Sequence, residues 1–292
     1  MTEQQDDQQI RETIRRLITE LGIEPGSNQS SLINSSSAAE ECLPDLGTID
    51  YRQVIGVRQP ADSEGLRSLR RATAARIAVG RTGPRYRTES LLRFRADHAL
   101  AMDAVFTEIS RSWLDKYQLP VFQTLCDSKD VFLTRPDLGR QFEASELEKI
   151  KKLASGAKVV VYVADGLSTA AVEANSMDAL KSLTAGLEAK KITVAPPFFV
   201  HYGRVGTQDA ISEATDCEAV CVLIGERPGL ITNESMSAYL AYRATVNMPE
   251  ARRTVVSNIH RGGTPAVEAG SYISEILEKM LERRVSGVEL KL

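Results

Sequence analysis

The chain has 292 residues, of which 42% are hydrophobic and 26% are charged, as in a globular protein of one large or two modest domains. Its formal net charge of −3 provides no general attraction to nucleic acid. No apolar stretch approaches the roughly 20 residues that span a bilayer, and the polar, acidic N-terminus excludes a secretory signal.

The N-terminal residues predict an amphipathic helix followed by a linker. Within residues 1–23 the apolar side chains recur at the spacing of one helical face: Ile10, Ile14, Leu17, Ile18 and Leu21. Residues 24–45 are rich in Ser, Asn and Ala and contain few large apolar groups, which is typical of a flexible linker. A short helix on such a linker is either a docking element or a frayed end.

Residues 46–140 predict a mainly helical region with a short β-hairpin. One helix is expected over 66–77 and a longer one over 89–109, since both carry regularly spaced apolar residues. Residues 119–134 predict two short strands around the polar turn at 127–130.

Residues 141–292 predict a Rossmann-like domain, because apolar strands alternate with helices. The expected strands are 159–163, 192–194, 219–224 and 254–257, and the expected helices are 168–188, 209–215, 235–244 and 265–284. This alternation favours a parallel sheet with helices on both faces. The predicted fold class is therefore α/β, with a helical N-terminal region ahead of a Rossmann-like parallel sheet.

Four polar, glycine-containing runs lie at the ends of these apolar segments. They are ADGLS (164–168), PFFVHYGRV (197–205), IGERPGL (224–230) and SNIHRGGTP (257–265). Because ligands of open α/β sheets bind at the carboxyl ends of strands, the four runs predict one binding edge. No G-x-G-x-x-G follows a strand and no Walker-type GK[ST] occurs, which argues against a nicotinamide or P-loop nucleotide site. No Ser-His-Asp arrangement with a nucleophile elbow is present either.

The pattern of cysteines favours a structural role over a metal-binding or catalytic one. A zinc site at Cys217 and Cys221 requires two further ligands at matching spacing, and the three histidines are widely scattered. Together with Cys42 and Cys126, these residues are interpreted as buried structural thiols in a reducing cytoplasm.

A cluster of arginines between residues 67 and 95 is the strongest local charge bias. Its members are Arg67, Arg70, Arg71, Arg76, Arg81, Arg85, Arg87, Arg93 and Arg95. The interpretations are a subunit interface, a solvated face and a nucleic-acid site. The interface is favoured because the guanidinium fork pairs with carboxylates, whereas the acidic chain lacks interleaved stacking aromatics.

Several separated motifs occur in an order that is far more specific than any one of them. These are GRTGPRYRTESLLRFRADHA (80–99), LTRPDLGR (133–140), YGRV, GERPGL and SNIHRGGTPAVEA. From about residue 46 to its C-terminus the chain resembles the small subunit, or light chain, of ethanolamine ammonia-lyase.

The resemblance implies a lyase that converts ethanolamine to acetaldehyde and ammonia by a radical mechanism that depends on adenosylcobalamin. It implies activity only with a large subunit, in an assembly of six large and six small subunits, and no nucleic-acid or membrane partner. This chain would form one wall of the cobalamin site and supply neither a catalytic residue nor a metal ligand. A non-catalytic ligand-binding or scaffold protein on a Rossmann-like fold is the alternative.

The resemblance also implies a location in a bacterial microcompartment, with residues 1–23 as the encapsulation helix that binds the shell. The alternative is a docking helix that packs against this chain or its partner.

Three cofactor-binding residues follow from the resemblance. Val205 closes YGRV and Glu226 lies in GERPGL, and Val255 occupies a strand position where the family often has a cysteine, so only its backbone or van der Waals contact carries over. The residues themselves make Glu226 conspicuous, because a carboxylate just past a buried strand requires a partner. That partner is Arg227, an arginine of another loop, or a row of ligand amide N–H groups.

His260 half-matches the cobalamin-binding pattern Asp-x-His-x-x-Gly. Asn258 stands where that pattern has the Asp that orients the imidazole, and the resemblance implies a cobalamin that keeps its own base on cobalt. His260 is therefore interpreted as a loop residue that hydrogen-bonds the backbone or the cofactor. Gly262, Gly263 and Pro265 are typical of a strand-to-helix turn. The residues leave open whether this turn only joins the two elements, and the resemblance favours a turn that faces the ligand.

Overall fold

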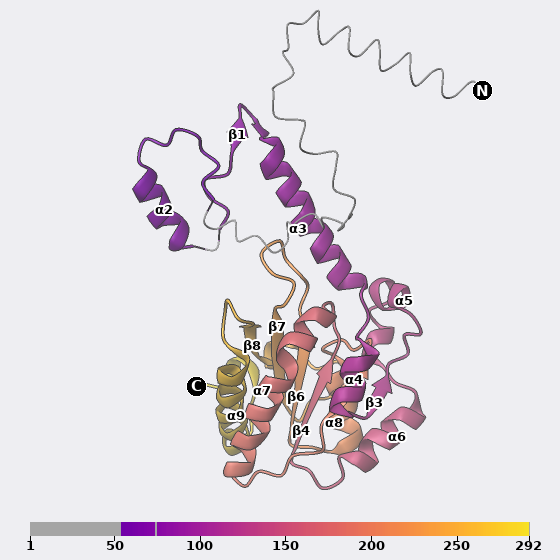
Figure 1. Cartoon of the computed structure of the whole chain (residues 1–292). Helices are drawn as coiled ribbons and strands as arrows, with labels where there is room; N and C mark the ends of the chain where they lie inside the picture. The colour runs from indigo at the N-terminus through magenta and orange to yellow at the C-terminus, as the bar shows by residue number, and fades with distance from the viewer. Residues whose placement is uncertain (1–53, 74, 292) are drawn as a thin grey trace, which may run out of the picture. The chain divides into compact units, whose positions relative to one another are not determined.

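The computed structural model describes residues 54–73 and 75–291, which are built around a six-stranded sheet (Figure 1). The predicted helix over 1–23 and the predicted linker over 24–45 lie outside the described residues, as does Cys42.

The sheet is mixed. Its strands, in spatial order, are β3 (Val121–Gln123), β5 (Phe198–His201), β4 (Val159–Ala164), β6 (Ala219–Gly225), β7 (Met236–Tyr242) and β8 (Thr254–Ile259). The first four are parallel, whereas β7 runs antiparallel to both β6 and β8. The prediction of an entirely parallel sheet is thus wrong at β7.

Helices cover both faces of the sheet, as predicted. Side chains alternate along each strand, so successive residues of β4 face opposite sides. Val159, Val161 and Val163 pack with α7 (Thr169–Ala189) and α9 (Ala266–Arg283). The residues between them pack with α6 (Ala144–Leu153) and α8 (Thr207–Thr215) on the other face.

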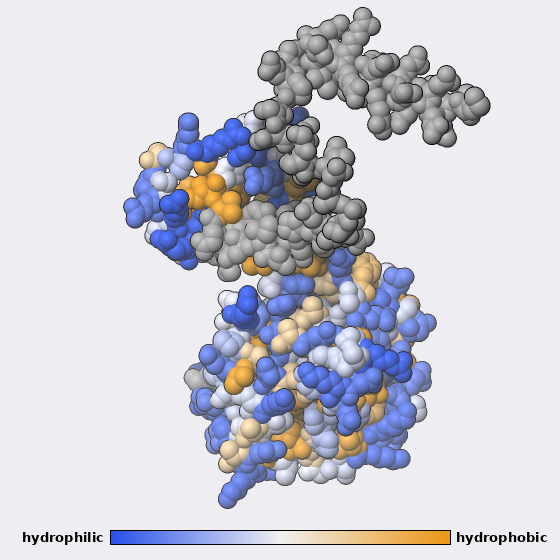
Figure 2. Space-filling view, in the orientation of Figure 1, coloured by the Kyte–Doolittle hydropathy of each residue, from blue (hydrophilic) through white to orange (hydrophobic). Residues whose placement is uncertain are grey.

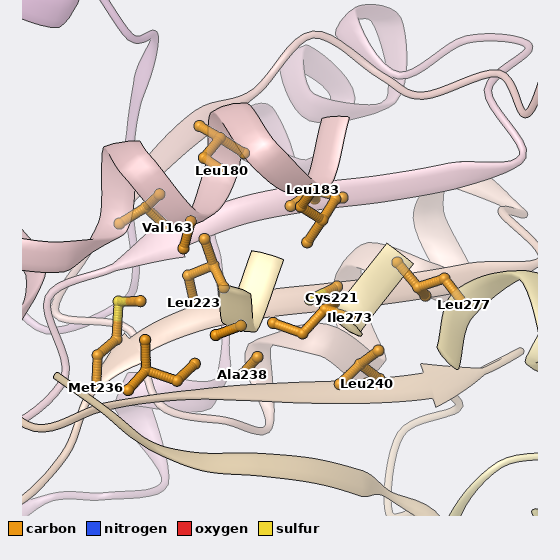
Figure 3. Packing of buried hydrophobic residues seen from close by; sticks show 14 of the residues in the cluster. Val163, Leu180, Leu183, Cys221, Leu223, Met236, Ala238, Leu240, Ile273 and Leu277 are labelled. Atoms are coloured by element: carbon orange, nitrogen blue, oxygen red, sulfur yellow. The ribbon is translucent and has the colours of Figure 1, made fainter. Parts of the chain in front are cut away.

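Helices α7 and α9 pack directly on each other as well as on the sheet. Figure 3 shows side chains of both helices meeting those of β4, β6 and β7; the labelled examples include Leu180, Leu183, Leu223, Leu240, Ile273 and Leu277. A Cβ atom at Gly270 of α9 would overlap the carbonyl oxygen of Ala179 in α7. Glycine therefore permits the close crossing of the two helices.

A buried ion pair joins Arg253, the residue before β8, to α8 on the opposite face. Arg253 donates from both terminal nitrogens to the carboxylate oxygens of Asp209, at 2.9 Å each, and from Nε to Glu250 at 2.8 Å. The bidentate geometry compensates for the desolvation of both charges.

The N-terminal part of the described chain is mainly helical. It contains α2 (Ser63–Arg71), the hairpin of β1 (Arg81–Thr82) and β2 (Arg85–Tyr86), α3 (Thr88–Phe106), α4 (Arg111–Tyr117) and α5 (Lys129–Thr134). A short 3-10 turn follows α5 at Leu138–Arg140, and others lie near the C-terminus at Glu250–Arg252 and Gly287–Glu289. The predicted helix over 89–109 is confirmed as α3, whereas the helix expected over 66–77 ends at Arg71.

Three local predictions are wrong because long-range pairing decides them. Residues 235–244, expected as a helix, contain strand β7, which pairs on both sides. The strand expected over 192–194 makes only a bridge at Val194, and β5 forms instead over Phe198–His201. The hairpin expected over 119–134 is absent, because β3 pairs with β5 and the second half folds into α5.

The cysteines within the described residues behave as predicted. Cys126, Cys217 and Cys221 are free and buried, and burial raises the pKa of each thiol, which disfavours a reactive thiolate. Across residues 54–73 and 75–291 no cluster of three or more His, Cys, Asp or Glu side chains is arranged to hold a metal ion.

None of the helices in the described part of the chain combines the length and apolar character that crossing a membrane requires. Figure 2 shows hydrophilic and apolar residues mixed over the visible surface of those residues.

Candidate functional site

The strand order reverses at β4. The chain passes from β4 through α7 to β5 on one side, and then through α8 to β6 on the other side of β4. Because α7 and α8 cover opposite faces, the carboxyl ends of β4 and β6 flank a topological switch point, where open α/β sheets bind ligands. The runs at 164–168 and 224–230 both lie at this switch point, as the sequence predicts.

Asp165 fastens the loop after β5 to the end of β4. Its Oδ1 accepts from the backbone N–H of Gly166 at 2.9 Å and of Gly203 at 3.0 Å, and its Oδ2 accepts from that of Tyr202 at 2.8 Å. Nδ1 of His201 lies 3.0 Å from Oδ2, outside hydrogen-bonding alignment. The carboxylate is fully buried, so these amide donors stabilise its charge.

The loop after β4 also contacts the end of β6. The backbone N–H of Leu167 donates to the carbonyl of Gly225 at 3.0 Å. A Cβ atom on Gly225 would overlap the carbonyl oxygen of Ser168, so glycine is required for this approach. Ser168 itself caps α7 by accepting from the N–H of Ala171 at 3.2 Å. The loops after β4, β5 and β6 therefore form one connected edge.

Glu226 follows β6 directly and is partly buried at this edge. Its Oε1 accepts from the hydroxyl of Tyr239 at 2.8 Å. Burial, and then the hydrogen bond to the carboxylate, raises the pKa of Tyr239, so the phenol stays protonated and donates. Of the partners that the sequence left open for Glu226, an arginine is not the one observed among the described residues, where Tyr239 donates to it instead.

Val255 lies on the same side of the sheet as this pair. Val255 on β8 is the cross-strand partner of Tyr239, and Tyr239 is the partner of Val222 on β6. Side chains of directly opposed residues project from the same face, so Val255 and Tyr239 share it. Val255 is 45% exposed on the edge strand. Across β7 it is in register with Val222 of β6, which lies four residues before Glu226 in the chain.

Val205 lies on the other side of β4 from Glu226. It follows β5, is partly buried, and packs against the hydrophobic cluster on the α6 and α8 face. Glu226, Tyr239 and Val255 border that same face, since Tyr239 also packs against this cluster. The structure thus places the three predicted cofactor-binding residues on one side of the sheet, with β4 between β5, which precedes Val205, and β6, which precedes Glu226.

His260 hydrogen-bonds the backbone of its own loop, as one interpretation of the sequence had it. Its Nδ1 accepts from the N–H of Gly262 at 3.1 Å. In the neutral imidazole this places the proton on Nε2, which then has no lone pair for a metal. The loop does lead into α9 through Pro265, which precedes the first helical residue.

Lys129 is a feature of the edge that the sequence did not single out. It is buried at the start of α5, and its Nζ has no hydrogen-bond partner, although it lies 5.2 Å from the ring centroid of Phe132. Burial lowers the pKa of Lys129, and Asp165 and Glu108 oppose that shift. The hydroxyl of Tyr202 donates to Glu108 at 2.5 Å.

Sequence reasoning also missed Asp165 and Tyr239. A signal for Asp165 was available, because an aspartate directly after a fully apolar strand requires buried donors. Tyr239 gave none, since its segment was predicted to be helical and only the pairing of β6, β7 and β8 brings it to Glu226.

Comparison with known proteins identifies the family. The family model of the ethanolamine ammonia-lyase light chain matches residues 63–291. The ethanolamine ammonia-lyase small subunit of Clostridium tetani is 49% identical over 288 residues, covering 96% of this chain and 98% of that protein. The small subunit of Lachnoclostridium phytofermentans is 44% identical, covering 98% and 99%, and that of Listeria monocytogenes is 44% identical, covering 98% and 100%. On this match along nearly its whole length, the chain belongs to the ethanolamine ammonia-lyase light chain family.

Proposed function

We propose that this chain is the small subunit of an adenosylcobalamin-dependent ethanolamine ammonia-lyase and forms one wall of the cobalamin site. The observation that carries the proposal is the position of Glu226 at the switch point between β4 and β6. Tyr239 orients one carboxylate oxygen by its hydrogen bond, and the other accepts none from the described residues. Membership of the ethanolamine ammonia-lyase light chain family, together with a partly buried carboxylate held at this edge, supports the proposal.

The residues of this edge fit the chemistry of a corrin. The periphery of cobalamin carries amide side chains, whose N–H groups donate and whose carbonyls accept. Glu226 offers a partly buried acceptor, and the Nζ of Lys129 is a buried donor without a hydrogen-bond partner. Val205 and Val255 offer apolar contact, since both present aliphatic side chains on one side of the sheet. These four residues would hold the cofactor, and none is proposed as a ligand of cobalt.

When bound, adenosylcobalamin would supply radical chemistry for the conversion of ethanolamine to acetaldehyde and ammonia. The residues of this chain bind and orient. Asp165 holds the β5 loop that carries Val205, Tyr239 holds Glu226, and the apolar side chains exclude water from the edge.

We expect the purified chain alone to show no deaminase activity and to bind cobalamin weakly, because one sheet edge buries only part of so large a cofactor. Co-expression with the large subunit of the same organism should give a complex that releases acetaldehyde from ethanolamine when adenosylcobalamin is added. A coupled alcohol dehydrogenase assay measures the product. Full activity of the chain by itself, or no activity of a formed complex, would contradict the proposal.

Glu226→Ala should weaken cobalamin binding by the assembled enzyme about 10- to 100-fold, on the order of 1–3 kcal/mol for a lost charged hydrogen bond. Titration followed by the change in cobalamin absorbance gives the Kd, and gel filtration tests assembly, which should persist. Glu234→Ala, at an exposed glutamate of the following loop, is the matched control. An unchanged Kd for Glu226→Ala would contradict a contact between Glu226 and the cofactor, and would show that its role is structural only.

The proposal further places the enzyme in a bacterial microcompartment, with residues 1–23 as the segment that binds the shell. Its support is the apolar stripe of that segment together with the family to which the chain belongs.

A further inference from the structure

Tyr239 reaches Glu226 from the neighbouring strand of the sheet. It lies on β7, which is flanked by β6 and β8, and it is paired with Val222 on one side and Val255 on the other (Figure 1). Its ring packs against the hydrophobic cluster on the α6 and α8 face, and its hydroxyl donates to Oε1 of Glu226 at 2.8 Å. The backbone N–H of Glu226 donates to the carbonyl of Ser235 at 3.0 Å. The pairing of β6 with β7 therefore fixes both ends of this contact.

Buried polar groups also fix the position of Tyr239. Its carbonyl accepts from Nε2 of Gln208 on α8 at 2.6 Å, and Gln208 is fully buried. Oε1 of Gln208 accepts from Arg253 at 3.2 Å, and Arg253 is itself held by its two hydrogen bonds to Asp209. Because these groups are already ordered, a ligand that binds beside Tyr239 does not have to order them.

The hydrogen bond between Tyr239 and Glu226 has a fixed direction. Burial raises the pKa of the phenol, and the neighbouring carboxylate raises it further, so the hydroxyl keeps its proton and donates. A carboxylate only accepts. Oε1 is occupied by Tyr239, whereas Oε2 accepts no hydrogen bond from the described residues. This residue pair thus presents an oriented acceptor, and no donor, to a ligand.

We infer that Tyr239 is a positioning residue that sets the specificity of this edge. It holds Glu226 so that Oε2 accepts from a carboxamide N–H, and a carboxylate at the same place is rejected. The inference rests on the proposed function, from which cobalamin, with its peripheral carboxamides, comes as the ligand. It adds the polarity of the contact and the residue that determines it.

Glu226→Gln tests the inference, because a glutamine amide has one accepting and one donating end. The phenol of Tyr239 requires an acceptor, so it should hold the amide oxygen and leave the NH2 group facing the ligand. Two donors then oppose each other, and we expect the assembled enzyme to bind adenosylcobalamin about tenfold more weakly. Titration followed by the change in cobalamin absorbance gives the Kd.

Tyr239→Phe should reverse part of that loss. Without the phenol, the amide introduced by Glu226→Gln turns over and presents its oxygen. The double variant Glu226→Gln/Tyr239→Phe should therefore bind adenosylcobalamin about threefold more tightly than Glu226→Gln alone. In the wild-type background, Tyr239→Phe should instead weaken binding by about threefold. A tyrosine that only stabilises the fold would weaken binding in both backgrounds.

Tyr242→Phe is the matched control. It removes a hydroxyl from the same strand, at a position whose side chain packs against the cluster on the α7 and α9 face. The variant should bind adenosylcobalamin like the wild type. Urea denaturation and gel filtration show whether each variant is folded and assembled.

A second measurement uses the wild-type enzyme and does not depend on the folding of any variant. Monocarboxylate derivatives of adenosylcobalamin each carry one carboxylate in place of a peripheral carboxamide. We expect one of them to bind about tenfold more weakly than adenosylcobalamin, because its charge would face that of Glu226. Glu226→Gln, whose NH2 group donates, should bind the same derivative more tightly than adenosylcobalamin itself.

The outcomes separate the two proposals. Wild-type affinity in both Glu226→Ala and Glu226→Gln contradicts the contact of Glu226 with the cofactor, which belongs to the proposed function. Weaker binding by Glu226→Gln, with no gain when Tyr239→Phe is added, leaves that contact intact and overturns the role of Tyr239. Equal binding of adenosylcobalamin and all its monocarboxylates by the wild type overturns the specificity inferred for this edge.

Discussion

Asp165→Ala should lower the free energy of unfolding by about 3 kcal/mol or more, because it removes the charged acceptor of a buried cluster of donors. The N–H groups of Gly166, Tyr202 and Gly203 lose their partner inside the protein. Tyr202 has a φ of 56°, an unfavourable backbone conformation that its hydrogen bond to Asp165 helps to maintain. Urea denaturation followed by circular dichroism measures the change.

Two variants control for this result. Asp165→Asn retains one carbonyl oxygen and the size of the side chain, so it should be destabilised less than the alanine variant. Asp115→Ala removes an exposed aspartate of α4 and should shift stability by no more than about 0.5 kcal/mol. Equal stability of Asp165→Ala and wild type would show that the edge does not depend on this carboxylate.

The same substitution should weaken cofactor binding in the assembled enzyme. Val205 and Asp165 belong to different loops, and the hydrogen bonds from Tyr202 and Gly203 to Asp165 join them. Without these hydrogen bonds, the β5 loop must be ordered when cobalamin binds, and this ordering costs conformational entropy. A cobalamin titration at a temperature where the variant is still folded separates this effect from global unfolding.

Deletion of residues 1–23 should abolish recruitment to microcompartment shells and leave deaminase activity and cobalamin affinity nearly unchanged. The predicted helix is too short to be stable alone in water, and the polar linker after it offers nothing to pack against. Its apolar stripe therefore requires a groove on another protein. Fusion of residues 1–45 to a fluorescent protein, imaged in cells that form shells, measures recruitment.

A pair of substitutions tests whether the stripe itself is recognised. Leu17→Asp places a charge within the stripe and should disperse the fluorescence, whereas Thr19→Asp places the same charge on the opposite side of the predicted helix and should not. If the deletion instead destroys the assembled enzyme, the segment is part of its core and the encapsulation proposal is wrong.

Elements whose local signals agree with their packing were predictable from the sequence. β4 and β6 are continuous apolar runs, and both are buried along their whole length as central strands. The predicted helices over 168–188 and 265–284 are confirmed as α7 and α9, with Ser168 at the first N-cap. The sequence also predicted correctly that Glu226 directly follows a buried strand, at the carboxyl edge of the sheet.

The other elements could not be predicted locally, because they depend on contacts between residues far apart in the chain. Met236–Tyr242 is a strand because β6 and β8 lie on either side of it, and this pairing brings Tyr239 to Glu226. The acceptor role of Asp165 depends on donors 37 and 38 residues later. Asp97 of α3 is buried and pairs with Arg76 and Arg93, an arrangement that hydrophobic periodicity alone does not reveal.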